Sequence, residues 1–374
     1  MQFETYPFEK LNNLLKDIKP NKDLEPLTLT IGEPQIETPR FIQDELCKSS
    51  NLLKKYSKSA GEDSLNDAMR DFVKRRFGVF LDKDELIPTF GTREVLFNLP
   101  QFLLFDKNSP SMAFTNPFYQ IYEGAAIASR AKIFHLNLTK ENNFKAKPNE
   151  YKEILKKSDL VIINFPNNPT SSSLSLDELR SWVRAAKEYD FVLINDECYS
   201  EIYYDTPPAS LLEASIKEAN ESFENILVVN SISKRSSAPG LRSGFVAGDK
   251  RILKEYKRYR TYLGCASPLP LQLASISAWS DEEHVRKNRE VYKKNFDIAK
   301  EILGCKIPKS TFYIWLEVED DLEFTKRLYK EKNLKVIPGS FLSRGEFKAK
   351  HIRIALVESS EKTKEALLRI KELL

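Results

Sequence analysis

The chain has 374 residues, more than one hydrophobic core usually supports, and we therefore expect two domains. Its 58 lysines and arginines nearly balance its 54 aspartates and glutamates, so the charge indicates neither nucleic acid nor an anionic membrane as a partner. Four widely spaced cysteines and three histidines predict no metal site and no disulfide framework. We expect a cytoplasmic protein, because no signal peptide is recognised and no stretch reaches the ~18 apolar residues of a membrane span.

From residue 85 onward, short apolar segments alternate with amphipathic ones. Segments 85–105 and 111–130 are each expected to form a strand, a turn and a helix. Strand, helix and strand are expected again over 159–205, and a further strand ends at Asn230. Short continuous apolar runs between amphipathic helices are typical of a mostly parallel sheet covered by helices on both faces. The predicted fold class is therefore α/β.

The pattern changes after Arg251. A basic helical stretch covers 251–263 and more helix follows to about Leu303, before three short strands that are expected within 310–319, 334–341 and 351–357. This pattern predicts a second, smaller α+β domain. We assign an N-terminal segment that joins the small domain, a large domain and a small C-terminal domain to residues 1–35, 36–280 and 281–374.

Polar residues follow each predicted strand of the large domain. They are Gly91 and Thr92, Asn116, Asn164 to Asn168, Asn195 and Asp196, and Ser231 to Lys234. Open parallel sheets bind ligands beyond the carboxyl ends of their strands. We therefore expect these residues to converge on one pocket.

The residue types at these strand ends suit one kind of ligand. Asp196 would be costly at the end of a buried strand without a cationic partner. The turn at Gly91 leaves free amides at a helix start, an anion site to which Ser231 and Arg242 would add a hydroxyl and a guanidinium. Lys234 remains as a nucleophile. A phosphate, a ring nitrogen that needs an anion and an aldehyde that needs an amine describe pyridoxal 5'-phosphate, the predicted cofactor.

The segment around Lys234 also resembles a family signature. Residues 231–244 match the pattern S-x-S-K-x(5)-G-x-R-x-G around the Schiff-base lysine of the class I and II aminotransferases, which are pyridoxal-phosphate enzymes of fold type I. The resemblance covers nearly the whole chain. Within the family, the segments that look like bacterial N-succinyldiaminopimelate aminotransferases are 91–99, 196–205, 231–249, 259–268 and 284–297.

This closer resemblance implies a reaction. An amino group would move between glutamate and N-succinyl-2-amino-6-oxopimelate, with 2-oxoglutarate as the other keto acid, in lysine and peptidoglycan precursor synthesis. Such a substrate carries carboxylates beyond the α-carboxylate, so further cations are expected to face the pocket. We hypothesise that these are Arg93, Arg235 and Arg260.

The resemblance implies a role for each matching residue. Lys234 would form the internal aldimine and move a proton between the substrate α-carbon and C4', while Asp196 would keep the ring nitrogen protonated. Arg353 would grip the substrate α-carboxylate, with help from the backbone at Gly32 and from Asn168. The remaining cofactor contacts would be Tyr199 and Asn168 at the ring oxygen O3', Tyr119 stacked on the ring, and Gly91, Thr92, Arg93, Ser231 and Arg242 around the phosphate.

A second subunit is implied as well. Tyr56 matches the tyrosine that completes the phosphate site of the neighbouring subunit, so we expect a homodimer with shared active sites. The chain departs from the family at Ser171, where glycine is common. We expect this serine to tighten its turn without changing a chemical role.

Alternatives to these assignments remain open. Aspartate aminotransferase or β-lyase activity would use the same cofactor. A non-catalytic pyridoxal-phosphate-binding regulator would need a DNA-binding domain, and the stretch before the first predicted strand near Leu27 leaves no room for one. Taken residue by residue, Lys234 could be a surface lysine, Asp196 a helix cap, Tyr119 a core residue and Arg353 part of a solvated strand face.

Overall fold

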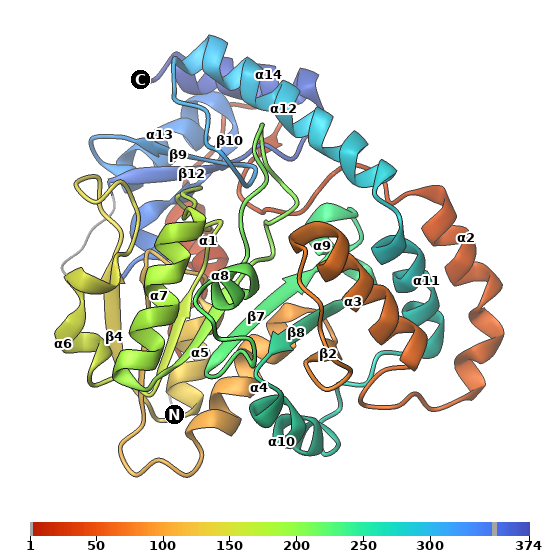
Figure 1. Cartoon of the computed structure of the whole chain (residues 1–374). Coiled ribbons are helices and arrows are strands. Elements are labelled where there is room, and N and C mark those ends of the chain that lie inside the picture. Colours follow the sequence, from red (N-terminus) through yellow and green to blue (C-terminus); the bar gives the residue numbers. More distant parts are fainter. Residues whose placement is uncertain (1–2, 346–349) are drawn as a thin grey trace.

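The computed structural model describes residues 3–345 and 350–374. Within them, a central sheet has the strand order β2-β8-β7-β6-β5-β3-β4 (Figure 1). Its strands are β2 (Leu86–Thr89), β3 (Ser111–Asn116), β4 (Lys132–Asn137), β5 (Leu160–Ile163), β6 (Val192–Asp196), β7 (Ile226–Ser231) and β8 (Gly244–Gly248). Strands β3 to β7 are parallel, and β8 is antiparallel to both of its neighbours. The predicted mostly parallel sheet is confirmed.

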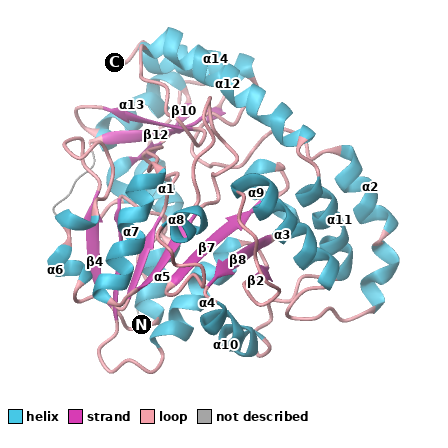
Figure 2. Ribbon diagram, in the orientation of Figure 1, coloured by secondary structure: helices cyan, strands magenta, loops and turns pink. Residues whose placement is uncertain are grey.

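Successive side chains of each strand pack on opposite faces of the sheet. Val161 belongs to a core with Trp182, whereas Ile162 belongs to a core with Val95. The first face is covered by α2 (Arg40–Lys48), α3 (Asp63–Phe77), α7 (Leu176–Tyr189), α8 (Leu211–Lys217) and α11 (Leu269–Ser280). The second face is covered by α4 (Thr92–Leu104), α5 (Ile121–Ala128) and α10 (Lys250–Arg260) (Figure 2). Burial on both faces explains why the strands are continuously apolar.

Short helical turns connect these elements. They are η1 (Ser50–Lys54), η2 (Pro148–Glu150), α6 (Lys152–Leu155), α9 (Ile232–Arg235) and η3 (Pro239–Leu241). The turn α9 matters most for the site, because it directly follows β7 at the carboxyl edge of the sheet.

A second set of strands lies toward the C-terminus. Strands β11 (Ile337–Pro338), β12 (His351–Ala355) and β9 (Tyr313–Glu317) form an antiparallel sheet, and β1 (Leu27–Thr28) pairs in parallel with β10 (Leu334–Lys335). The associated helices are α1 (Pro7–Leu15), α12 (Glu283–Leu303), α13 (Asp321–Lys332), η4 (Gly339–Leu342) and α14 (Ser360–Lys371). N-terminal strand β1 therefore lies beside C-terminal strands. The boundaries at residues 35 and 280 stay predictions, and residues 1 and 2 lie outside the described part of the chain.

A search of the described helices for a membrane span finds none of sufficient length and apolar character.

Candidate active site

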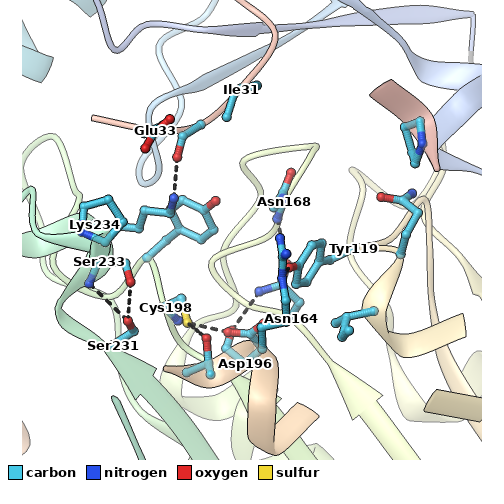
Figure 3. Close-up of a pocket in the computed structure, with 18 of the residues that line it drawn as sticks. Ile31, Glu33, Tyr119, Asn164, Asn168, Asp196, Cys198, Ser231, Ser233 and Lys234 are labelled. Carbon is cyan, nitrogen blue, oxygen red and sulfur yellow. Dashed lines mark hydrogen bonds between the residues drawn. The ribbon is translucent and has the colours of Figure 1, made fainter. Parts of the chain in front are cut away.

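A pocket of about 740 Å³ opens at the carboxyl edge of the central sheet (Figure 3). The predicted site residues that line it are Gly32, Thr92, Arg93, Tyr119, Asn168, Asp196, Tyr199, Ser231, Lys234, Arg242 and Arg353. Segments from the central sheet and from β12 thus converge there, as expected for an open α/β sheet.

Some strand-end residues predicted at the pocket do not line it, among them Gly91, Asn116 and Asn195. The Asn116 amide donates to Asn137 Oδ1 at 2.8 Å and to the Arg344 carbonyl at 3.1 Å. The Asn195 amide donates to Glu197 Oε1 at 2.9 Å and to the Phe165 carbonyl. Both amides are buried, so bonds to neighbouring loops satisfy them.

Lys234 lies in the turn after β7, and its environment favours the uncharged amine. Ser231 caps this turn, because its Oγ accepts from the Ser233 amide at 3.1 Å. The Lys234 Nζ donates to the Gly32 carbonyl. Burial lowers the pKa of Lys234 to about 8, with smaller contributions from nearby Arg353 and Arg242. A lysine with this pKa can act as a nucleophile near neutral pH.

Asp196 is the last residue of β6 and is 5% exposed. Its Oδ2 accepts from the Tyr122 hydroxyl at 2.8 Å and its Oδ1 accepts from the Cys198 amide at 3.2 Å. Burial raises the pKa of Asp196, against these hydrogen bonds, which lower it. Among the described residues its hydrogen-bond partners are neutral, so a cationic ligand group such as a protonated ring nitrogen would stabilise the carboxylate.

The start of α4 and Arg242 form a cradle that suits phosphate. Gly91 precedes the helix with φ +72°, and a Cβ added there would lie 2.2 Å from Arg242 Nη2. The positive φ favours glycine, and a Cβ at this position would displace the Arg242 guanidinium. Arg242 Nη1 donates to the Pro239 carbonyl at 2.8 Å, and the Ser231 hydroxyl lies 2.8 Å from that of Ser233. Helix amides, a guanidinium and hydroxyls together fit a phosphate group.

Tyr119 lines the pocket with its hydroxyl engaged. The Arg93 Nε donates to that hydroxyl at 2.8 Å. Burial is the main reason why the pKa of Tyr119 is raised above its ordinary value. The ring is half-buried at the pocket wall, and Arg93 itself is exposed in the same pocket.

Arg353 lies on β12 and is only 5% exposed, so the solvated strand face considered from the sequence is wrong. Its Nη1 donates to Asn168 Oδ1 at 2.7 Å and its Nη2 donates to the Thr30 carbonyl at 2.6 Å. The Tyr313 ring lies 4.4 Å from the guanidinium carbon. A buried guanidinium at a pocket wall is suited to a carboxylate.

Two of the arginines proposed for the distal carboxylates lie outside the pocket. Arg235 is 1% exposed and donates to the Ala278 carbonyl at 2.8 Å and to Glu282 at 2.9 Å. Arg260, also 1% exposed, pairs with Glu94 at 3.0 Å. The hypothesis is wrong for both residues, because each guanidinium is buried outside the pocket and bonded to other groups of the protein.

Tyr56 is fully exposed and does not line the pocket. Its contact with a neighbouring subunit stays a prediction.

Sequence reasoning missed three residues at the site. Tyr122 bonds to Asp196, Cys198 Sγ lies 3.1 Å from Thr92 Oγ1, and the Tyr313 hydroxyl lies 2.9 Å from that of Tyr199. Tyr122 follows Tyr119 by three residues and Cys198 lies between Asp196 and Tyr199. This proximity to assigned residues was the sequence signal that could have identified Tyr122 and Cys198. No comparable signal marked Tyr313.

The comparisons with known proteins agree with this geometry. The family model "Aminotransferase class I and II" matches residues 25–370. An LL-diaminopimelate aminotransferase of Aquifex aeolicus is 31% identical over 98% of this chain and 96% of that protein. The crystal structure of aminotransferase AspB from Helicobacter pylori is 50% identical with a TM-score of 0.96, covering 100% of this chain and 99% of that one. An aminotransferase from Neisseria meningitidis is 39% identical with a TM-score of 0.94, covering 100% and 98%.

Class I and II aminotransferases use pyridoxal 5'-phosphate. The cradle at Gly91 and Arg242, the buried Asp196 carboxylate and the Lys234 amine fit the phosphate, ring nitrogen and aldehyde of this cofactor. The family match over 25–370 thus agrees with the chemistry of the pocket. This chain belongs to the class I and II aminotransferase family.

Proposed function

We propose that this aminotransferase moves an amino group between glutamate and N-succinyl-2-amino-6-oxopimelate, in lysine and peptidoglycan precursor synthesis. One observation carries the proposal. The pocket contains a buried cation, Arg353, and an exposed one, Arg93, and its walls include the apolar side chains of Phe97 and Ile121. A substrate with separated carboxylates and a methylene chain matches those groups.

The cofactor, when bound, supplies an electron-withdrawing ring that stabilises negative charge at the substrate α-carbon. Lys234 would hold the cofactor through its aldehyde and would then carry the proton that leaves or returns to the substrate α-carbon. Its lowered pKa supports this assignment, because an amine with a pKa of about 8 accepts and releases protons near neutral pH. Asp196 would keep the ring nitrogen protonated, and its burial among neutral donors would strengthen that interaction.

The other residues bind and orient. Arg353 holds the α-carboxylate and Asn168, which already contacts Arg353, fixes the direction of the guanidinium. Tyr199 would donate to the ring oxygen. Arg242, Ser231 and the amides at the start of α4, where Gly91, Thr92 and Arg93 lie, would hold the phosphate.

We further propose a cytoplasmic homodimer in which Tyr56 reaches the partner's phosphate site. Its full exposure supports this role, since a tyrosine contacting another subunit must project from its own. A large domain over 36–280 and a small domain over 281–374 belong to the same proposal.

Aspartate aminotransferase is the second candidate, because aspartate also presents two carboxylates. Arg93 is the observation that favours it, since this arginine could take the β-carboxylate. A β-lyase would share the first steps but would expel the substituent on the substrate β-carbon and release that group, a keto acid and ammonia, without converting a second substrate.

A substrate screen tests the proposal. Protein loaded with pyridoxal 5'-phosphate is mixed with N-succinyl-LL-diaminopimelate, LL-diaminopimelate, aspartate or aromatic amino acids, and kcat/KM is measured with 2-oxoglutarate. We expect the succinylated donor to rank first. Arg93→Gln should raise its KM while that of glutamate changes less, and Arg258→Gln, which alters an exposed arginine outside the pocket, should change neither. A higher kcat/KM for aspartate than for the succinylated donor would reject the proposed substrate but would leave the transaminase activity standing.

A further inference from the structure

Tyr313, the first residue of β9, contacts several groups of the proposed machinery. It is 2% exposed and lines the pocket. Its hydroxyl lies 2.9 Å from that of Tyr199, and its ring lies 4.4 Å from the guanidinium carbon of Arg353. A Cβ added to Gly32 would lie 1.8 Å from the Tyr313 hydroxyl, so this oxygen also fills the space beside the Lys234 contact.

The direction of the hydrogen bond between the two tyrosines follows from proton counting. Each hydroxyl has one proton to donate. If Tyr199 gives its proton to a ligand, the proton between Tyr199 and Tyr313 must come from Tyr313. A hydroxyl that accepts a hydrogen bond also becomes a stronger donor.

We propose that Tyr313 is a positioning residue: its hydroxyl donates to Tyr199 and so directs the Tyr199 proton to the cofactor ring oxygen, while its ring supports Arg353. The inference rests on the proposed roles of Tyr199 and Arg353. It assigns the orientation of the Tyr199 hydroxyl and the support of the Arg353 guanidinium to one side chain on β9, which lies outside the motifs that mark the cofactor site.

The departure at Ser171 gives this tyrosine a tether. The Ser171 Oγ donates to the Tyr313 carbonyl at 2.8 Å and lies 2.6 Å from Thr311 Oγ1. Ser171 has φ +61°, a conformation that glycine adopts more readily. The serine hydroxyl thus joins the Asn168 loop to β9, and the expectation that it has no chemical consequence is revised: it fixes Tyr313.

The decisive experiment needs no turnover. Cofactor-bound protein without substrate is titrated with base while its visible absorption is recorded. In Tyr313→Phe, Tyr199 no longer accepts a hydrogen bond and becomes a weaker donor to the ring oxygen, which is negatively charged in the high-pH form. We expect the midpoint to rise by up to about 0.5 pH unit, a fraction of the effect of one hydrogen bond to a charged group. Arg353 and Cys198 are the other titratable groups beside Tyr199, and both are unchanged in this variant.

The matched control is Tyr292→Phe. Tyr292 is also 2% exposed, but it does not line the pocket and its hydroxyl has no hydrogen-bond partner among the described residues. Its titration should overlay that of the wild type. A wild type without any visible band would reject the proposed function itself, whereas identical titrations of the wild type and Tyr313→Phe would overturn only the inference.

A comparison of Tyr313→Phe with one further variant, Tyr313→Leu, separates the role of the ring from that of the hydroxyl. Tyr313→Phe keeps an aromatic face under Arg353, so the KM for L-glutamate should stay within about twofold, while Tyr313→Leu should raise it about fivefold. Equal KM values for the two variants would show that the Tyr313 ring does not support Arg353.

The tether has its own test. Ser171→Gly relieves the backbone conformation but removes the hydroxyl, so its titration midpoint should move in the same direction as in Tyr313→Phe. Ser173→Ala, which loses a hydroxyl without a hydrogen-bond partner in the same loop, should not move it. A Ser171→Gly titration that matches the wild type would refute the tether.

Discussion

Arg260 and Glu94 form a buried ion pair, with 3.0 Å between Nη2 and Oε2, that joins the end of α10 to the first turn of α4. Arg260 Nη1 also donates to the carbonyls of Ser59 and Pro88, at 3.0 and 2.9 Å. Glu94 Oε2 accepts from the Phe90 amide at 3.2 Å. The pair therefore fixes the loop that presents the amides of the phosphate cradle.

Removing one partner of this pair should destabilise the protein. Arg260→Ala leaves Glu94 charged and buried, which typically costs about 3 kcal/mol of unfolding free energy. Arg258→Ala, two residues away, breaks an exposed pair with Glu255 and should cost about 0.5 kcal/mol or less. Urea unfolding of the cofactor-free variants measures the difference. Similar losses in the two variants would show that the buried pair has no special weight.

The glycine at the cradle can be tested separately. Gly91→Ala would place a Cβ 2.2 Å from Arg242 and force a positive φ on alanine, so cofactor binding should weaken about tenfold or more. Gly240→Ala is the control, because its Cβ would meet no atom within 4 Å. Spectrophotometric titration of cofactor-free protein with pyridoxal 5'-phosphate gives both dissociation constants. Equal dissociation constants for Gly91→Ala and Gly240→Ala would show that the cradle at Gly91 does not bind the cofactor phosphate.

Replacing Arg353 should weaken substrate binding but leave cofactor binding unchanged. Arg353→Gln removes a charged, buried hydrogen-bond donor, and we expect the KM for L-glutamate to rise roughly 10- to 100-fold. Arg327→Gln, on the exposed face of α13, serves as control. Cofactor affinity should match the wild type in both variants. An unchanged KM would mean that another group binds the α-carboxylate.

Lys234 should give the cofactor-free protein a distinctive pH dependence of stability. Its folded pKa is lowered to about 8 from an ordinary 10.5, chiefly by burial. Between these values the unfolded chain binds the proton and the folded chain releases it, so stability rises with pH across this interval. Lys234→Met should lack that rise and be relatively more stable below pH 8. Thermal unfolding at several pH values checks this, and parallel curves for both proteins would contradict it.

Much of this arrangement was accessible from the sequence because it follows from local pattern. Strands such as β5 are buried on both faces, so Val161 and Ile162 are both apolar and mark a parallel sheet. Asp196 and Lys234 end or follow such strands, and the rule for open sheets brings them together.

Other contacts were not predictable because they join distant segments through geometry alone. Tyr199 meets Tyr313 across 114 residues and Asp196 meets Tyr122 across 74. Nothing in the local pattern distinguishes Arg260, which is buried and paired, from Arg93, which is exposed in the pocket. The partner of a charged side chain is set by tertiary packing, which a linear pattern does not encode.

The most direct test of the central claim is a single half-reaction followed by absorbance. Wild-type protein loaded with pyridoxal 5'-phosphate should lose its visible band when mixed with N-succinyl-LL-diaminopimelate, as the amino group passes to the cofactor. The second-order rate constant for this half-reaction should be at least about tenfold higher with N-succinyl-LL-diaminopimelate than with aspartate. Lys234→Ala should remain folded and lack the reaction. A wild-type protein whose spectrum does not change with any amino donor, or an active Lys234→Ala variant, would contradict the assignment.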